Sequence, residues 1–181
     1  MFHFPVDDNI ELRLHEEQHA QTLFDLIDDN RDHLRPWFPW VEPTEDVTDS
    51  LEFIQKCRQG YADNDVFPTS IWFRDEMAGT FGLFDLDFHT GSGEIGYWLG
   101  RKFEGRGIVT RTCRAVLDYA FDDLDLQRVS IRTIPDNTRS AAVAQRLGFT
   151  LEGTLRNVTK LHGELRDLEV YSILRREWFS R

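Results

Sequence analysis

The spacing between hydrophobic residues changes along the chain, and each spacing predicts either a strand or a helix. Residues 10–14 alternate apolar and polar side chains, which is the period of a half-buried strand. Helical spacing follows and predicts a helix that ends near Asn30, with an apolar face made of Ala20, Leu23, Phe24 and Ile27. A second helix is predicted to begin at Thr48, with one buried stripe made of Leu51, Ile54, Arg58 and Tyr61.

Residues 34–40, between these two helices, form an apolar segment with two prolines and two tryptophans. The prolines forbid a regular helix through the segment. Two interpretations stay open: the segment covers the core, or it forms the wall of a binding groove. The sequence favours the first.

After Pro68 the period becomes that of strands. Residues 69–74 and 77–87 predict a hairpin around Asp75-Glu76, and residues 94–99 predict a third strand. A long amphipathic helix is expected next, with one apolar face made of Val109, Cys113, Val116, Leu117, Ala120, Phe121 and Leu124. The remaining elements are a strand, a short helix and a closing hairpin, over 128–134, 138–147, and 150–157 with 165–174.

This order of elements combines hairpins with two helical crossovers. Hairpins join antiparallel strands and helical crossovers join parallel ones, so the sheet should be mixed. We therefore expect an α/β (α+β) fold with a central mixed sheet flanked by helices. A length of 181 residues predicts a single domain over 1–181.

The composition of the chain disfavours several classes of binding partner. The chain has 21 Lys and Arg against 32 Asp and Glu, a net charge of -11, which disfavours direct contact with nucleic acid. No apolar stretch approaches the length of a membrane span and the N-terminus lacks the pattern of a signal peptide, so we expect a cytoplasmic protein without membrane contact. Cys57 and Cys113 lie far apart and are expected to be small buried residues, and no metal site is expected.

The segment 101–110 is positively charged, although the chain as a whole is acidic. It lies between a predicted strand and a predicted helix and contains two glycines separated by one residue, Gly105 and Gly107. Glycines let the backbone come close to a ligand, and the first turn of the following helix presents unpaired N–H groups, which favours an anion. Residues 101–114 contain one acid, Glu104, and five basic residues: Arg101, Lys102, Arg106, Arg111 and Arg114.

Four interpretations of this segment compete. A nucleoside-triphosphate loop needs Lys and a hydroxyl residue after its last glycine, where Arg106 and Gly107 stand. The dinucleotide fingerprint needs a third glycine where Thr110 stands. The pyrophosphate loop of acyl-CoA enzymes fits the middle glycine, and a tight turn without a ligand fits as well.

Further motifs support the acyl-CoA interpretation. They are residues 94–99 (EIGYWL), 137–140 (NTRS), 141–149 (AAVAQRLGF) and 152–156 (EGTLR). In order and spacing the chain resembles the GNAT superfamily of N-acetyltransferases, and more narrowly the RimJ/RimL branch of ribosomal-protein N-terminal acetyltransferases. The resemblance extends from about residue 10 to residue 178 and implies a mostly antiparallel sheet. In that family acetyl-CoA enters a cleft where two neighbouring parallel strands splay apart, here 94–99 and 128–134.

The resemblance also implies which residues bind acetyl-CoA. Backbone groups of Trp98 and Leu99 would pair with the pantetheine arm. The pyrophosphate would be held along the loop and first helical turn, at Glu104, Gly105, Arg106, Gly107, Ile108, Val109 and Thr110. Two of these depart from the family pattern: Glu104 replaces Gln or Arg, and Val109 replaces a smaller residue.

Transfer to an amine requires removal of a proton from the amine, a donor for the oxyanion, and protonation of the departing thiolate. The N–H near Trp98 is the candidate oxyanion donor. Ser140 matches a family serine and is the candidate donor to the thiolate, although its hydroxyl could instead bond its own helix. Asn137 would contact the pantetheine, cap that helix, or do both. Glu94 is the candidate base, acting through water, or else a solvated carboxylate at a strand end.

The resulting prediction is an acetyl-CoA-dependent N-acetyltransferase that needs no metal and transfers the acetyl group directly to a primary amine. The branch favours a protein N-terminus, such as that of a ribosomal protein, and a homodimer is common in the family. The acidic composition keeps a second class of acceptor open, a cationic small molecule such as a polyamine or an aminoglycoside. A third alternative is an acyl-CoA-binding sensor without catalytic activity.

Overall fold

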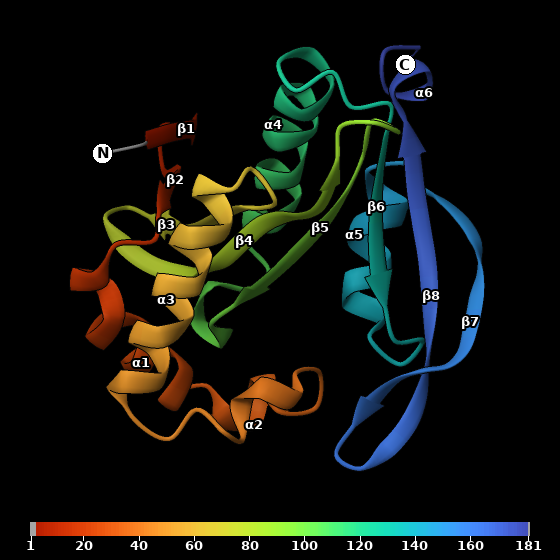
Figure 1. The fold of residues 1–181 in the computed structure, drawn as a ribbon. Helices are drawn as coiled ribbons and strands as arrows, with labels where there is room; N and C mark the ends of the chain where they lie inside the picture. Colours follow the sequence, from red (N-terminus) through yellow and green to blue (C-terminus); the bar gives the residue numbers. More distant parts are fainter. Residues whose placement is uncertain (1–2, 181) are drawn as a thin grey trace. The chain divides into compact units, whose positions relative to one another are not determined.

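The computed structural model describes residues 3–180, and they form two compact units (Figure 1). The first unit contains the chain up to Gly82 together with Tyr97–Ile108, and the second contains Leu83–Gly96 and the chain from Val109 onward. Strands β4 (Glu76–Asp87) and β5 (Ser92–Leu99) continue from one unit into the other.

The strands follow the order β1-β2-β3-β4-β5-β6-β8-β7 in one eight-stranded sheet. The ladders β1–β2, β2–β3, β6–β8 and β7–β8 are antiparallel, and β5–β6 is parallel. The fold class expected from the sequence, a mixed and mostly antiparallel sheet flanked by helices, is therefore confirmed.

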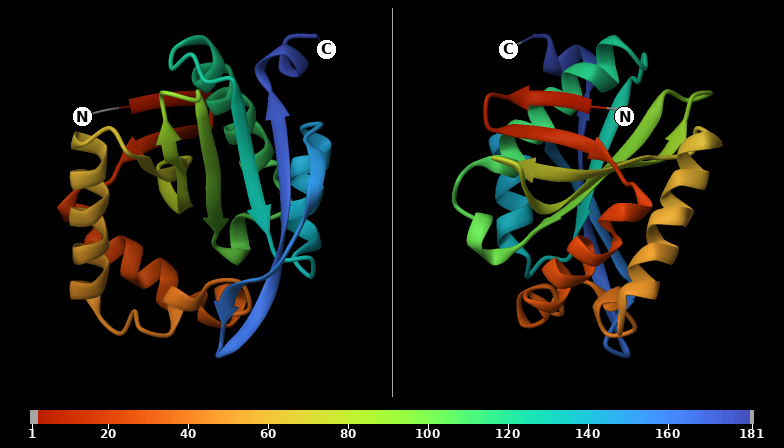
Figure 2. Two further views of the ribbon diagram at one scale, coloured as in Figure 1. Left: turned by 45° about the vertical axis from the view of Figure 1, so that its right-hand side comes forward. Right: turned by 90° about the vertical axis from the view of Figure 1, so that its left-hand side faces the viewer.

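The first unit contains three strands besides its parts of β4 and β5, and several helices (Figure 2). Its strands are β1 (His3–Asp7), β2 (Ile10–Leu14) and β3 (Phe67–Phe73). Its α-helices are α1 (Ala20–Asp28), α2 (Arg31–Leu34) and α3 (Val47–Ala62), and its 3-10 turns are η1 (Glu17–His19), η2 (Pro39–Val41) and η3 (Arg101–Phe103). Helices α1 and α3 pack against each other, and α3 packs on β3.

Two elements of this unit were absent from the sequence prediction. Strand β1 contains Pro5 and no fully buried residue, so the alternation that marks a strand is weak there. Helix α2 is a single turn ahead of Pro36, too short to produce a helical period. The predicted hairpin between β3 and β4 exists, but its turn is centred one residue earlier, on Arg74 and Asp75, which both have positive φ.

The predicted stripe of α3 is partly wrong. Ile54 is fully buried as expected, but its buried partners on the helix are Ser50 and Cys57. Arg58 and Tyr61 are exposed instead. Long amphipathic side chains place their polar ends in water, so a stripe that includes them is a weaker indicator of the buried face than one of small residues.

The apolar segment 34–40 is only partly buried. Leu34 is buried, whereas Trp37, Phe38 and Trp40 are half-buried and both prolines are exposed. The segment therefore presents aromatic surface to solvent as well as to the protein, and it could cover the core, line a groove, or do both.

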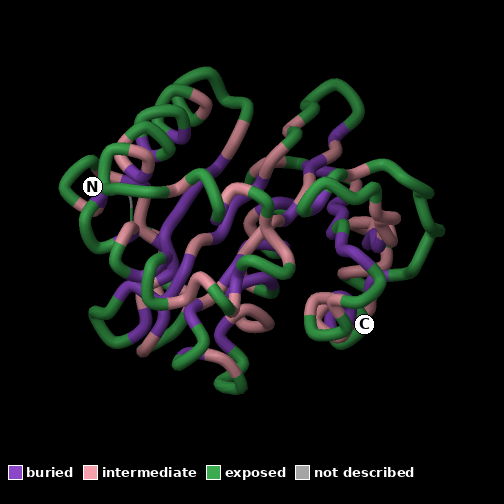
Figure 3. Tube along the Cα trace, turned by 90° about the horizontal axis from the view of Figure 1, so that it is seen from below, coloured by how far each residue is buried: buried purple, intermediate pink, exposed green. Residues whose placement is uncertain are grey.

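The second unit contains α4 (Ile108–Asp122), β6 (Arg128–Thr133), α5 (Thr138–Arg146), β7 (Thr150–Leu161), β8 (Glu164–Leu174) and α6 (Arg175–Trp178). Most of the predicted α4 stripe is confirmed: Cys113, Val116, Leu117, Ala120 and Phe121 are fully buried. Both cysteines are buried and free, as predicted. Buried positions are frequent along β3, β4 and β6, whereas most of β7 and of α3 is exposed. Figure 3 colours the chain trace by burial.

Strand β7 forms one edge of the sheet, and ten of its twelve residues are exposed. The ladder between β7 and β8 shifts register between Leu155 and Thr159, and Asn157 within this stretch has a φ of 53°. The cations Arg156 and Lys160 also lie on β7, beside exposed Leu155 and Val158.

Residues 3–180 lack two kinds of feature, a membrane-spanning helix and a metal-binding cluster. No helix in this range is long and apolar enough to cross a membrane. No cluster of three or more His, Cys, Asp or Glu side chains in the same range is arranged to hold a metal ion.

Candidate functional site

The loop between β5 and α4 adopts a backbone that two glycines make possible. Gly105 has a φ of 72° and Gly107 a φ of 69°, in the left-handed region that L side chains rarely adopt. A Cβ built on Gly105 would lie more than 4 Å from every described atom outside its neighbours, so backbone conformation rather than space requires this glycine. Helix α4 begins at Ile108, directly after these glycines. The first-turn amides of a helix have no intrahelical acceptor, so this end of α4 can bind an anion.

Asn30 anchors the start of this loop within the first unit. Its side-chain Oδ1 accepts a hydrogen bond from the backbone N–H of Arg101 at 2.8 Å, and its Nδ2 donates to the carbonyl of Leu26 at 2.8 Å. The side chain therefore connects the end of α1 to the loop. The backbone N–H of Gly100 also donates to the carbonyl of Ala78 at 2.8 Å.

Phe103 gives the loop an apolar anchor. It is 3% exposed and meets the Phe73 ring edge-on, with 6.5 Å between ring centroids. The guanidinium of Arg106 lies 5.6 Å from the centre of the same Phe73 ring, a cation–π distance. The loop is thus held ahead of its glycines by Phe103 and between them by Arg106.

Glu104, the acid among the loop cations, is paired with a histidine. Its Oε1 lies 3.3 Å from Nε2 of His33 on α2, and its side chain is 28% exposed. Lys102 is paired with Glu76. The departure from the family pattern at Glu104 therefore has a local partner, because His33 can donate a hydrogen bond to the carboxylate.

Trp98, near the end of β5, belongs to an aromatic cluster of the first unit. Its ring centroid lies 5.8 Å from that of Trp40, and Trp40 lies 5.3 Å from Phe38. Trp98 is 8% exposed, whereas Trp40 and Phe38 are half-buried. The cluster gives the segment 34–40 a rigid apolar surface beside the end of β5.

In the second unit, Glu94 lies in a charged group with Arg132 and Asp85. Arg132 contacts the Glu94 carboxylate through Nε, and its Nη2 lies 3.2 Å from Oδ2 of Asp85. Burial raises the pKa of Glu94, an effect that nearby Asp85 adds to and Arg132 opposes. A carboxylate with a raised pKa is a stronger base than an exposed one, as a proton acceptor for an amine requires.

Asn137 caps helix α5, as the sequence predicted. Its Oδ1 accepts a hydrogen bond from the backbone N–H of Ser140 at 3.2 Å, which satisfies one N–H of the first turn. Ser140 is half-buried in that turn. On α4, the hydroxyl oxygen of Thr110 accepts a hydrogen bond from Nη1 of Arg146 at 2.9 Å, which joins the start of α4 to the end of α5.

The parallel ladder between β5 and β6 is short. Among residues 3–180 the pairs of this ladder join Ser92–Glu94 to Arg128–Ser130, although β5 continues to Leu99 and β6 to Thr133. Glu94 is therefore the last paired residue of its strand in this ladder.

Two residues that the sequence analysis missed support the loop. They are Asn30, which accepts a hydrogen bond from the loop backbone at Arg101, and His33, which pairs with Glu104. Each partner lies about 70 positions further along the chain, and no local pattern indicates such a contact. An Asn beyond the end of a helix is common in its own right, so Asn30 carried no distinguishing signal.

Comparisons with known proteins agree with this geometry. Residues 9–150 match the family model described as "Acetyltransferase (GNAT) domain". YdaF of Bacillus subtilis (strain 168), named provisionally as a ribosomal N-acetyltransferase, is 37% identical over 98% of both chains.

Two solved structures are similar in fold over nearly the whole chain. The microcin C7 self-immunity acetyltransferase MccE, in complex with acetyl-CoA and AMP, has a TM-score of 0.89 and 31% identity, covering 93% of this chain and 94% of its own. RimL, a ribosomal L7/L12 alpha-N-protein acetyltransferase in complex with coenzyme A, has a TM-score of 0.92 and 27% identity, covering 96% of this chain and 98% of its own.

Proposed function

The chain belongs to the GNAT family of acetyl-CoA-dependent N-acetyltransferases, and from this premise we propose that it acetylates a primary amine directly, with a protein N-terminus as the favoured acceptor. The observation that carries the proposal is the loop before α4. Its two left-handed glycines lead directly into the first turn of a helix, within the range that the family model matches. This arrangement suits a pyrophosphate, because backbone N–H groups and the helix dipole both attract negative charge.

The residues of the loop fit acetyl-CoA, which when bound would supply the thioester that the amine attacks. We assign the pyrophosphate to the backbone between Gly105 and Thr110, with Arg106 adding positive charge. Glu104 is compatible with this assignment because its carboxylate is paired with His33. We assign the pantetheine arm to the backbone of Trp98 and Leu99, and to Asn137.

Glu94 is our candidate base. An α-amine has a pKa near 8, so at neutral pH most of the acceptor carries a proton that must leave before attack. The raised pKa of Glu94 increases its basicity, and Arg132 partly opposes that rise. We propose that Glu94 accepts the proton from the amine nitrogen through a water molecule.

Ser140 is our candidate donor to the departing sulfur. Its position in the first turn of α5 is fixed by the Asn137 cap. We propose that its hydroxyl donates a hydrogen bond that stabilises the departing thiolate, and that the backbone N–H near Trp98 stabilises the charge on the carbonyl oxygen. Both cysteines are buried and burial raises the pKa of each thiol, which favours direct transfer over a covalent acyl-thiol route.

The proposed acceptor rests on the relatives. YdaF and RimL carry names that refer to ribosomal proteins, and a reaction on such proteins would take place in the cytoplasm. We also propose that the protein forms a homodimer, as members of this family commonly do. A small-molecule amine is the second candidate, and MccE supports it, because that similar structure binds the nucleotide AMP beside acetyl-CoA.

The first experiment measures ligand binding by thermal unfolding of the purified chain with acetyl-CoA, ATP or NAD. A ligand at about 100 times its dissociation constant stabilises a protein by about 2.7 kcal/mol, or roughly 5–10 °C for a domain of this size. We expect this increase with acetyl-CoA and not with the other two nucleotides. An equal response to all three would contradict a specific acyl-CoA site.

The second experiment measures free thiol released from acetyl-CoA with three acceptor classes: peptides with free N-termini, a polyamine and an aminoglycoside. We expect turnover with the peptides. Turnover confined to the other two would establish the small-molecule alternative, and acetyl-CoA binding without thiol release from any acceptor would establish the sensor. Ser140→Ala should lower kcat while leaving acetyl-CoA affinity unchanged, and Arg139→Ala, next to it and exposed, is the matched control.

A further inference from the structure

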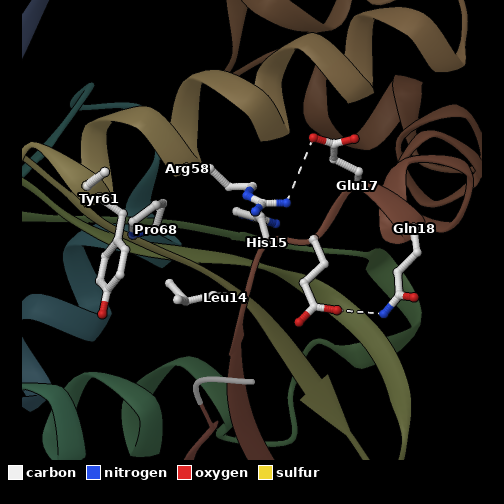
Figure 4. A pocket seen from close by; sticks show the side chains of 9 residues that line it. Leu14, His15, Glu17, Gln18, Arg58, Tyr61 and Pro68 are labelled. Carbon is white, nitrogen blue, oxygen red and sulfur yellow. Dashed lines mark hydrogen bonds and ion pairs between the residues drawn. The ribbon is translucent and has the colours of Figure 1, made fainter.

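A pocket of about 740 Å³ lies in the first unit, where the end of β2, η1, the last turns of α3 and the start of β3 come together (Figure 4). Its walls include Leu14 at the end of β2 and His15 directly after that strand. They also include Arg58 and Tyr61 from α3 and Pro68 from β3. None of the lining residues belongs to the proposed acetyl-CoA site. Its volume is within the range of small-molecule sites in proteins.

His15 is a buried polar side chain in the wall of this pocket. It is 3% exposed, and its Nδ1 has no hydrogen-bond partner among the described residues. Burial lowers the pKa of His15 to about 4, with a smaller contribution from His19, so the ring is neutral at pH 7. The Phe53 ring meets it edge-on at 5.5 Å. A buried polar atom without a partner destabilises a protein, and this ring nitrogen has none among the described residues.

Both signs of charge line the pocket. The Arg58 guanidinium lies 3.8 Å from the carboxylate of Glu17, and each side chain is more than half exposed. Glu16 accepts a hydrogen bond from Gln18 at 2.6 Å. Exposed ion pairs at such distances contribute little stability, so Arg58 can exchange its protein partner for a ligand carboxylate at small cost.

We propose that this pocket binds a small zwitterion, an ammonium and a carboxylate on one apolar frame, of the size of a dipeptide. The carboxylate would pair with Arg58. The ammonium would lie against Glu16 and Glu17 and donate a hydrogen bond to the imidazole of His15. The apolar frame would contact Leu14 and Pro68.

The test is a titration of the full chain, labelled with ¹⁵N in its histidines, with leucylglycine at neutral pH. The signal followed is the imidazole nitrogen of His15, identified by its loss in His15→Gln. We expect a saturable shift of that resonance. N-acetyl-leucylglycine lacks the ammonium and leucylglycinamide lacks the carboxylate, and we expect each to bind about two- to fivefold more weakly, the loss for one exposed charged pair.

Variants assign the binding to the pocket. Arg58→Met should weaken leucylglycine binding by about two- to fivefold, the loss for an exposed ion pair, and Glu17→Gln should weaken it in the same direction. Arg176→Met, which changes another exposed arginine, on α6, should leave it unchanged. The thermal response to acetyl-CoA should be the same in all of them, which shows that the variants fold.

Three results would overturn the proposal. They are no saturable change at His15 up to about 10 mM leucylglycine, equal affinity for leucylglycinamide, and unchanged affinity in Arg58→Met. The proposed acetyltransferase activity is separate from all three, because its own readouts are acetyl-CoA binding and thiol release.

Discussion

Acid should destabilise this protein through His15. The side chain is 3% exposed and burial lowers its pKa from 6.5 to about 4. In the unfolded chain the imidazole regains its ordinary pKa and takes up a proton below pH 6.5. Between about pH 4 and 6.5 the unfolded state therefore binds more protons than the folded state, and stability decreases as pH falls through this window.

The magnitude follows from the two pKa values. One pH unit corresponds to about 1.4 kcal/mol, so the full difference between 6.5 and about 4 amounts to about 3 kcal/mol. At pH 4.5 most of it, about 2–3 kcal/mol, would already be lost relative to neutral pH. This is a large fraction of the total stability of a typical domain, about 5–15 kcal/mol.

The assay is urea unfolding of the wild-type chain and His15→Gln at several pH values between 4.5 and 7.5. Glutamine does not titrate, so the difference between the two free energies of unfolding isolates His15. We expect this difference to change by about 2–3 kcal/mol over the range, with the wild type losing more stability at low pH. His89→Gln, at an exposed position, should follow the wild type. Parallel curves for the wild type and His15→Gln would refute the reasoning.

Four further predictions follow from the loop and the two units. Gly107→Ala places a Cβ at a positive φ and should lower the free energy of unfolding by about 1 kcal/mol in urea; an unchanged midpoint would contradict the requirement for glycine. Asn30→Ala removes two hydrogen bonds at the loop and should cost about 1–2 kcal/mol in the same assay, with Asp29→Ala as the exposed control. Asn137→Ala removes the cap of α5 and should cost about 1 kcal/mol by thermal unfolding, whereas Asn137→Asp should retain most of it. Arg132→Met removes the cation that opposes the rise in the pKa of Glu94, so the acid limb of the kcat/KM profile should move to higher pH; a limb that does not move would show that Glu94 is not the base.

Elements in which apolar side chains repeat at regular spacing could be predicted from the sequence, and elements without such a repeat could not. Strand β2 and helix α4 have clear apolar faces, and both were placed to within about two residues. Strand β1 is short and contains Pro5, and helix α2 is a single polar turn, so both depend on neighbouring elements rather than on their own pattern. Helix α3 was placed well, but its buried face was assigned to large side chains instead of Ser50 and Cys57.

Some residues of the candidate site could likewise be predicted from a local sequence pattern, and others could not. Gly105 and Gly107 could be found because a glycine pair between a strand and a helix is a local signal. The contacts that support them, from Asn30 and His33, join positions far apart in the chain and give no such signal. The environment of Glu94 also needed the structure, since its pKa depends on burial and on Arg132 across the β5–β6 ladder.

The exposed edge at β7 has a consequence for the behaviour of the protein at high concentration. A long edge strand with exposed leucine and valine side chains is a template on which another chain can add a strand and begin to aggregate. Here the register shift between Leu155 and Thr159 interrupts the row of backbone groups, and Arg156 and Lys160 place positive charge along it. A second copy approaching edge to edge would meet the same irregularity and the same charges. The bulge and the cations thus protect the folded chain from uncontrolled self-association through this edge.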